Sequence, residues 1–273
     1  KALNTRHSQG WVDEVFYDIS SLVERVKKAQ KNREIKSLAY LGNVIDVWEA
    51  FYDSNIHVDL GSDQTSLHNP WAGGYYPVGL SYEEANTLMV SNPDLFKDKV
   101  KESLRKHAKI VQKHTDKGTY FFDYGNAFLL EASRAGADVL ATPGSKLFNR
   151  TIDGLAFAYP SYVQDILGPM CFDYGFGPFR WVCCSGDPQD LEKTDRIAEQ
   201  VLQRLRENAP VEIQQQLADN IRWIQEAGKN KMVVGSQARI LYADADGRMA
   251  IAQAFNEAIA AGTIGPVVLG RDH

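Results

Sequence analysis

The segment Gly61–Pro77 holds the densest collection of chemically useful side chains in this sequence. It combines three glycines and two prolines with hydroxyl, amide and imidazole groups and three aromatic rings, and it follows a short alternating stretch, Ile56–Leu60. A loop this long is uncommon in a compact domain unless it binds something or is disordered. Disorder is disfavoured because Trp71, Tyr75 and Tyr76 are costly to leave in water. Loops at the carboxyl ends of strands in α/β proteins bind ligands, so we predict a ligand site here.

The first half of the chain holds two further polar candidates, one inside this loop and one after a predicted strand. His68 lies in the middle of the loop beside amide and hydroxyl groups. It either contacts a polar ligand or stabilises a turn. The run Asp123-Tyr-Gly-Asn126 comes directly after an apolar stretch, and it is either a ligand-binding turn or a strand end with a capping asparagine.

Two candidates lie in the second half. Arg180 stands between aromatic residues in Gly-Pro-Phe-Arg-Trp, and its planar fork suits a carboxylate or a phosphate. The alternative is an arginine stacked on Trp181 for packing. Asp272 follows an apolar strand together with Arg271 and His273. Charged groups in that position are typical site residues, but a surface ion cluster is the alternative.

The composition argues against several classes of protein. The chain has 273 residues, a net charge of −5 and no basic block, which argues against nucleic acid as a partner. We find no apolar run long enough to span a bilayer and no signal peptide, so we predict no membrane association and a cytoplasmic location.

The three cysteines, Cys171, Cys183 and Cys184, do not form a disulfide framework, which fits a reducing compartment. We expect the adjacent pair to be buried small hydrophobes, and no zinc-ligand spacing is present. Neither GxGxxG nor the Walker pattern occurs. From the residues alone, a dinucleotide site is therefore a weak prediction.

Helix-like and strand-like patterns alternate over residues 18–134. We predict helices at Asp18–Asn32, Val44–Tyr52, Ser81–Asn92, Pro93–Lys117 and from Gly125-Asn126 to Arg134, and strands at Ile35–Leu41, Ile56–Leu60 and Thr119–Asp123. This alternation predicts a parallel sheet with crossover helices and a binding crevice at the carboxyl ends of its strands.

The pattern changes after a polar stretch at Gly136–Gly154. We predict helices at Pro160–Leu167, Asp187–Asn208, Pro210–Ala227 and Met249–Ala261, and strands at Met232–Val234, Ala238–Tyr242 and Pro266–Leu269. The chain starts without methionine and stops just after a predicted strand, so we expect an internal piece of a longer protein.

At these same motifs the sequence resembles the urocanase family of histidine breakdown, in its animal-type form. The resemblance covers nearly the whole chain. It is carried by Tyr40-Leu-Gly-Asn-Val44, Asp63-Gln-Thr-Ser-Leu-His68, Gly73-Gly-Tyr-Tyr-Pro77, Phe122-Asp-Tyr-Gly-Asn126, Gly175-Phe-Gly-Pro-Phe-Arg-Trp181, Ser185-Gly-Asp-Pro188, Gln237-Ala-Arg239 and Gly270-Arg-Asp-His273.

The resemblance implies an α/β fold in two parts. Residues 1–148 would form a Rossmann-like NAD-binding domain whose sheet is incomplete, because the first βα unit is missing. Residues 149–273 would form part of an α/β core domain. The family's enzymes are homodimers that hold NAD⁺ tightly and add water to urocanate, giving imidazolone propionate. The oxidised nicotinamide serves there as an electrophile toward the imidazole ring, without net hydride transfer.

The resemblance also implies roles for individual residues. The residues expected to contact NAD⁺ are Asn43, Val44, Gln64, Thr65, Ser66, Leu67, His68, Tyr75, Tyr76 and Tyr124. Arg180 would hold the urocanate carboxylate, and Asp272 would help proton transfer or water positioning. No metal is implied.

The sequence departs from the family pattern in three places. The glycine-rich phosphate turn with its acidic ribose-binding residue would lie upstream of Lys1, and a later glycine-rich segment would lie beyond His273. Bacterial forms carry a cysteine where this chain has Leu241, so an essential thiol at that position is not supported. An NAD(P)-dependent dehydrogenase and a non-catalytic nucleotide-binding module are the alternative functions.

Overall fold

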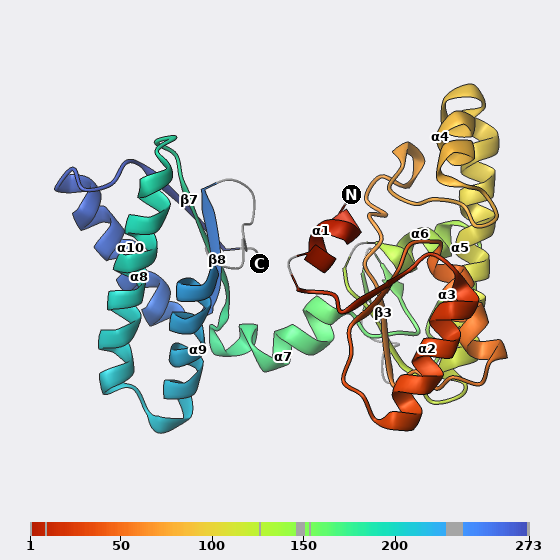
Figure 1. The fold of residues 1–273 in the computed structure, drawn as a ribbon, viewed down its shortest axis with the longest axis horizontal. Coiled ribbons are helices and arrows are strands. Elements are labelled where there is room, and N and C mark those ends of the chain that lie inside the picture. The colour runs from red at the N-terminus through yellow and green to blue at the C-terminus, as the bar shows by residue number, and fades with distance from the viewer. Residues whose placement is uncertain are drawn as a thin grey trace. The chain divides into compact units, whose positions relative to one another are not determined.

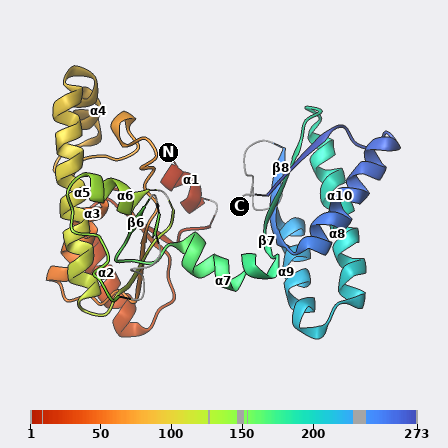
Figure 2. The same ribbon diagram turned by 180° about the vertical axis from the view of Figure 1, so that it is seen from behind.

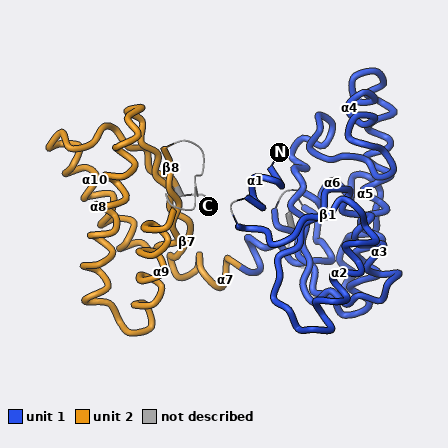
Figure 3. The backbone as a smooth tube through the Cα atoms, in the orientation of Figure 1, with its two compact units in different colours: residues 1–166 blue, residues 167–273 orange. Residues whose placement is uncertain are grey.

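The computed structural model describes residues 2–8, 10–125, 127–145, 151–152, 154–227 and 237–271. The chain divides into two compact units, residues 1–166 and residues 167–273 (Figure 3). This division falls after the boundary predicted at residues 148 and 149, and that boundary stays a prediction for the domains of the longer protein.

Unit 1 alternates helices and strands, as Figure 1 shows. Its elements are α1 (Ala2–Ser8), β1 (Glu14–Phe16), α2 (Ile19–Asn32), β2 (Leu38–Tyr40), α3 (Val44–Asp53), β3 (Leu60–Asp63), η1 (Pro70–Ala72), α4 (Tyr82–Ser91), α5 (Pro93–Thr115), β4 (Tyr120–Asp123), α6 (Phe128–Arg134), β5 (Thr151–Ile152) and β6 (Leu155–Ala156). The π-helical turn η2 (Tyr162–Leu167) ends the unit and takes the place of the helix predicted at Pro160–Leu167.

Strands β1 to β4 of unit 1 pair in parallel, which confirms the predicted α/β arrangement. β1 pairs with β2, and β3 pairs with β4 with Asp63 opposite Asp123. Within the described residues these are two separate two-stranded sheets rather than one continuous sheet. The carboxyl ends of β3 and β4 therefore lie side by side.

The position of β3 corrects the strand predicted at Ile56–Leu60. The strand instead begins at Leu60, which is exposed, and Gly61 is the first inward-facing residue. A Cβ atom added to Gly61 would lie 2.5 Å from the ring of Trp48. The glycine therefore lets the strand pass close to this buried ring, and the first residues of the predicted loop belong to the strand.

The core of unit 1 forms around α5. Phe96, Val100 and Leu104 recur at intervals of four residues and are fully buried on one face of this helix. They belong to the same hydrophobic cluster as Phe121 of β4 and Phe128 of α6. The buried face of α5 therefore packs against β4 and α6 in one core.

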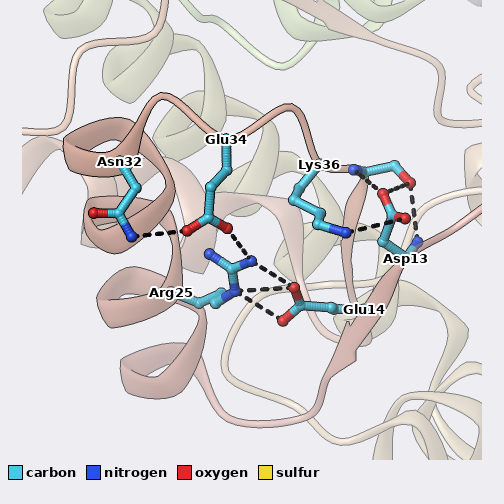
Figure 4. Close-up of polar contacts among 7 residues, drawn as sticks. Asp13, Glu14, Arg25, Asn32, Glu34 and Lys36 are labelled. Carbon is cyan, nitrogen blue, oxygen red and sulfur yellow. Dashed lines mark hydrogen bonds and ion pairs between the residues drawn. The ribbon is translucent and has the colours of Figure 1, made fainter.

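A polar network ties α2 to the strands beside it (Figure 4). The Nη2 atom of Arg25 lies 2.6 Å from Oε1 of Glu14 and 2.7 Å from Oε2 of Glu34. The hydrogen bonds from Arg25 lower the pKa of Glu14. Nearby, Lys36 pairs with Asp13. These contacts fix the edge formed by β1 and the segment before β2.

Unit 2 is built on an antiparallel sheet. Its elements are α7 (Gly168–Met170), η3 (Phe172–Tyr174), β7 (Gly177–Cys183), α8 (Pro188–Asn208), α9 (Val211–Ala227), β8 (Ala238–Ala243), α10 (Ala245–Ala260) and β9 (Val267–Arg271). The strand order is β8-β7-β9, and helices α8 and α10 lie against one face of this sheet in both ribbon views (Figures 1 and 2). The strand predicted at Met232–Val234 lies outside the described residues.

The central strand β7 was not predicted as a strand, because its sequence begins with glycine and proline. Pro178 pairs with Tyr242 of β8, whereas pairing with β9 starts one residue later at Phe179. Proline lacks the N–H that an inner strand needs, and here it lies beyond the part of β7 that has neighbours on both sides.

No helix in the described part of the chain is long and apolar enough to cross a membrane.

Candidate functional site

A cleft of about 850 Å³ opens in unit 1 beside the first turn of α3. Its described lining is Leu41, Gly42, Asn43, Val44, Asp46, Thr65, Gly74, Tyr75, Tyr76, Pro77, Gly79, Leu80, Ser81, Tyr82 and Glu83. This volume lies within the roughly 300–1,000 Å³ of small-molecule sites. Five of the predicted contact residues line it, namely Asn43, Val44, Thr65, Tyr75 and Tyr76.

Asn43 joins the two walls of this cleft. Its Oδ1 atom accepts a hydrogen bond from the backbone N–H of Ile45 at 3.0 Å and so caps α3. Its Nδ2 atom donates to the backbone carbonyl of Tyr76 at 3.0 Å. One amide therefore fixes both the start of the helix and the segment that faces it.

Tyr75 and Tyr76 have different environments although they are adjacent. Tyr75 is only 3% exposed, and its hydroxyl lies 3.2 Å from Nδ1 of His107. Tyr76 is half-buried and donates to Oδ1 of Asn86 at 3.1 Å. Its ring centroid lies 5.2 Å from that of Tyr82, so the two rings form an aromatic wall. Tyr75 thus anchors the segment in the core, and Tyr76 faces the cleft.

His107 in α5 was not identified as a site residue from the sequence. It is fully buried, and burial lowers its pKa to about 3, so the imidazole is neutral at physiological pH. Its Nδ1 atom faces Tyr75, while its Nε2 atom has no hydrogen-bond partner among the described residues. The signal in the sequence was its helical spacing from Val100 and Leu104, which places it on the apolar face of α5.

The other half of the loop is held by its own backbone. A Cβ atom on Gly74 would lie 2.1 Å from the carbonyl oxygen of Ser66 and 2.5 Å from that of Asn69. The backbone N–H of Gly74 donates to that same Asn69 oxygen at 3.2 Å. Only glycine permits this approach, and the loop closes on itself at this point.

The predicted contact segment Gln64–His68 is divided by the structure. Thr65 lines the cleft, whereas Leu67 is 1% exposed and packs in the core. Gln64, Ser66 and His68 are exposed and do not line the described cleft. The backbone N–H of Leu67 donates to the carbonyl of Thr65 at 2.8 Å, so the chain turns between these residues, and one side chain lines the cleft while the other enters the core.

Two buried carboxyl groups end the adjacent strands β3 and β4. Asp63 accepts hydrogen bonds at Oδ1 from both the N–H and the hydroxyl of Thr65. Asp123 accepts from the N–H of Gly125 at 3.0 Å and from that of Leu129 at 3.3 Å. Burial raises the pKa of each, and the neighbouring charge of Asp123 adds to the rise for Asp63.

Tyr124 follows Asp123 but does not line the described cleft. It is 37% exposed, and its ring stacks on Tyr162 with centroids 4.8 Å apart and planes 11° from parallel. Because β3 and β4 are neighbours, this aromatic pair belongs to the same strand-end edge of unit 1.

In unit 2, Arg180 lies in the middle of β7. It pairs with Gly270 of β9 and with Ile240 of β8, and its side chain is half-buried. Asp272, the other predicted catalytic residue, lies outside the described residues. The structure therefore describes only Arg180 of the two.

The remaining positions singled out in unit 2 are structural. Leu241 is 2% exposed and packs in the core opposite Phe179. Cys183 is buried, its Sγ atom lies 3.5 Å from the hydroxyl of Thr194, and burial raises the pKa of its thiol. Cys184 is exposed, so the expectation that both cysteines are buried is wrong for this one. Consecutive residues at a strand end face opposite sides.

Within the described residues, no group of three or more histidine, cysteine, aspartate or glutamate side chains is arranged to hold a metal ion.

Parallel strand pairs joined by helices, with a ligand-sized cleft at the start of a helix, define a Rossmann-like α/β unit. Comparison of the sequence with models of known protein families identifies which family this is. The urocanase Rossmann-like domain matches residues 1–166, and the urocanase C-terminal domain matches residues 169–273. The chain belongs to the urocanase family.

Named relatives agree with this assignment. The chain is 53% identical over 276 residues to a probable urocanate hydratase of Dictyostelium discoideum, and 52% identical over 279 residues to the urocanate hydratases of Mus musculus and Homo sapiens. All of the chain is covered in each comparison, and it spans 40% of the length of each relative.

Proposed function

We propose that this chain is part of a urocanate hydratase, a hydro-lyase that adds water to urocanate to give imidazolone propionate, with NAD⁺ bound in the cleft of unit 1. The observation that carries this proposal is the convergence of five expected contact residues on one cleft. Asn43 and Val44 come from the start of α3, Thr65 from the end of β3, and Tyr75 and Tyr76 from the loop.

The chemistry of the cleft fits a nucleoside part of this cofactor. Among its described lining residues the charged ones are Asp46 and Glu83, and both are acidic. Carboxylates accept hydrogen bonds from ribose hydroxyls and complement the positive charge of an oxidised nicotinamide. The N-terminus of α3 adds a region of positive potential that tolerates a nearby phosphate.

The bound cofactor would supply an electrophile toward the electron-rich imidazole ring of urocanate. The protein's own residues would do the rest. Asn43 holds the two cleft walls together, and the Tyr76 and Tyr82 rings would offer an aromatic surface to the cofactor. Arg180 would bind the substrate carboxylate through its planar fork. Asp272 would position the attacking water or move a proton.

The same proposal covers the remaining properties. The substrate is a small molecule, and the full-length protein is expected to be a cytoplasmic homodimer that needs neither nucleic acid nor a membrane. The net charge of −5 and the lack of a basic block support the absence of a nucleic-acid partner.

The test uses the full-length protein that contains this chain. Purified without added cofactor, it should consume urocanate and form imidazolone propionate. Arg180→Lys should raise KM for urocanate by about tenfold or more, because a point charge replaces a bidentate fork. Arg206→Lys, on the exposed face of α8, is the matched control and should leave KM unchanged. Unchanged KM and kcat in Arg180→Lys would remove Arg180 from the substrate site.

A further inference from the structure

Asp63 controls the orientation of one side chain in the wall of the cleft. It is the last residue of β3, is 3% exposed, and accepts two hydrogen bonds from Thr65 on the same carboxylate oxygen. One comes from the backbone N–H at 3.0 Å, and the other comes from the hydroxyl. Both the backbone and the χ1 angle of Thr65 are therefore fixed from within the core.

This arrangement determines what the threonine hydroxyl can offer a ligand. A hydroxyl has one hydrogen to donate and two lone pairs that accept. The hydrogen of Thr65 is directed to Asp63. Any part of the oxygen that is open to the cleft therefore presents only lone pairs, which suit a ligand N–H or O–H and repel a phosphate oxygen.

We propose that Asp63 is a positioning residue that orients Thr65, so that the Thr65 hydroxyl accepts a hydrogen bond from a donor group of the bound dinucleotide. The inference rests on the proposed function and extends it to the identity of the contact. The donors that the cofactor carries on its nucleosides are its carboxamide N–H, its adenine amino group and its ribose hydroxyls.

The surroundings keep Asp63 in place. Its partner across the parallel pair is Asp123, and the close approach of Gly61 to Trp48 fixes the strand two residues earlier. On the other side, Gly74 closes the loop against the carbonyl of Ser66, directly after Thr65. The carboxylate is therefore held by elements that do not depend on the ligand.

The test measures the dissociation constant for NAD⁺ by titration of the cofactor-depleted full-length protein. Thr65→Val removes the hydroxyl at nearly constant shape, and Asp63→Ala removes the group that orients it. Each should weaken binding by about five- to tenfold. The double variant should lose little more than either single one, because both changes break the same arrangement. Fully additive losses would show that Asp63 does not act through Thr65, and would overturn the proposal.

Two further variants separate positioning from general support of the fold. Asp63→Asn keeps an oxygen where both hydrogen bonds converge, and should retain the wild-type dissociation constant. Asp18→Ala is the matched control, because Asp18 accepts from the N–H and hydroxyl of Ser21 at 2.8 and 2.9 Å away from the cleft. It should lower the melting temperature without changing NAD⁺ binding. Equal loss of binding in Asp18→Ala and Asp63→Ala would reduce Asp63 to a structural role and contradict the proposal.

Cofactor analogues identify the donor. One analogue has a carboxylate in place of the carboxamide, a second has hypoxanthine in place of adenine and so lacks the amino group, and a set of others each lack one ribose hydroxyl. The analogue that lacks the correct donor should bind the wild type more weakly than NAD⁺ does, and Thr65→Val should abolish that difference. If no analogue shows this pattern, the proposed contact is wrong.

The outcomes also distinguish this inference from the function on which it rests. A wild-type protein that does not bind NAD⁺ overturns the proposed function. A wild-type protein that binds NAD⁺, with Asp63→Ala binding it equally well, overturns only the role of Asp63.

Discussion

Asp63 and Asp123 lie directly opposite one another at the carboxyl ends of the adjacent parallel strands β3 and β4. Each buried carboxylate accepts hydrogen bonds from the turn that follows it. One turn leads to Thr65 in the cleft wall and the other carries Tyr124. The family resemblance connects both segments with NAD⁺. Each of them follows a strand that ends in an aspartate, and that aspartate holds the turn through hydrogen bonds.

This pair predicts a particular dependence of stability on pH. The folded pKa of Asp63 is raised above its ordinary value of 3.8, so the folded state binds more protons than the unfolded state between that value and the raised one. Stability from this group therefore falls as the pH rises through that window. Asp63→Asn removes the titration, so its stability relative to wild type should rise from the acidic to the neutral end of the window.

Urea unfolding of the full-length protein and of Asp63→Asn at several pH values measures this gain. Thr65→Val is a useful companion, since it keeps the carboxyl group. A difference between wild type and Asp63→Asn that does not change with pH would contradict the raised pKa.

His107 predicts acid sensitivity of the opposite sign. Its folded pKa is lowered to about 3, below the ordinary 6.5, so the unfolded state binds the extra proton between these values. Stability is then lost as the pH falls through this window, by at most about 1.4 kcal/mol per pH unit. His107→Gln keeps an acceptor for Tyr75 and cannot titrate, so its unfolding free energy should vary less steeply with pH. An equal slope in both proteins would show that His107 is not buried as a neutral group.

Gly74→Ala should disrupt the cleft more than Gly79→Ala does. The added methyl group would meet two backbone carbonyls, at Ser66 and Asn69, and neither can move without opening the loop. Gly79→Ala is the control from the same cleft lining. Gly79 has a positive φ of 81° but open space around its Cβ position, so strain of about 1–2 kcal/mol is its only penalty.

NAD⁺ content after gel filtration of the two full-length variants is the measurement. Gly74→Ala should lose most of its cofactor, and Gly79→Ala should keep most of it. The reverse order would show that closure of the loop at Gly74 is not needed for binding.

Substitutions at Asn43 should affect the stability of the fold and the binding of NAD⁺ to different extents. Asn43→Asp keeps a capping oxygen for Ile45 but loses the donation to the carbonyl of Tyr76. It should unfold at nearly the wild-type temperature while NAD⁺ binding weakens by about tenfold. Asn43→Ala loses both contacts, and should also lose about 1 kcal/mol of stability. Calorimetry for stability and titration for binding test the pair, and parallel changes in both quantities would refute the separation.

Local signals explain which elements could be predicted from the sequence. Asp18 caps α2, and Ser81 with Glu84 forms a capping box at the start of α4. Helix ends with such side chains are specified by nearby residues alone. The start of α10 was placed too late, at Met249 rather than Ala245, because Gly247 obscures the helical pattern of its first turn.

Strand positions depended on contacts that the sequence does not reveal. The pattern at Ile56–Leu60 alternates like a strand, but the packing of Gly61 on Trp48 moves β3 to Leu60–Asp63. β7 was missed because Gly177 and Pro178 disfavour strands locally, and its neighbours β8 and β9 stabilise it instead.

The candidate site shows the same division. The family motifs identified the residues that meet at the cleft, including Asn43, Thr65 and Tyr76. They did not separate these from Leu67, which faces the core, and they did not single out Asp63 or His107. The spacing of His107 places it on the apolar face of α5, but its contact with Tyr75 is tertiary and cannot be read from the sequence. Asp63 contacts Thr65 only two residues on, but the sequence alone does not show that its carboxylate is buried.

The most direct test of the central claim follows urocanate and NADH in the same reaction. The full-length protein, without added NAD⁺, should consume many equivalents of urocanate through the loss of its ultraviolet absorbance while no NADH accumulates. That result would establish hydration with a retained cofactor. Accumulation of NADH in step with turnover would contradict the account and indicate a dehydrogenase instead.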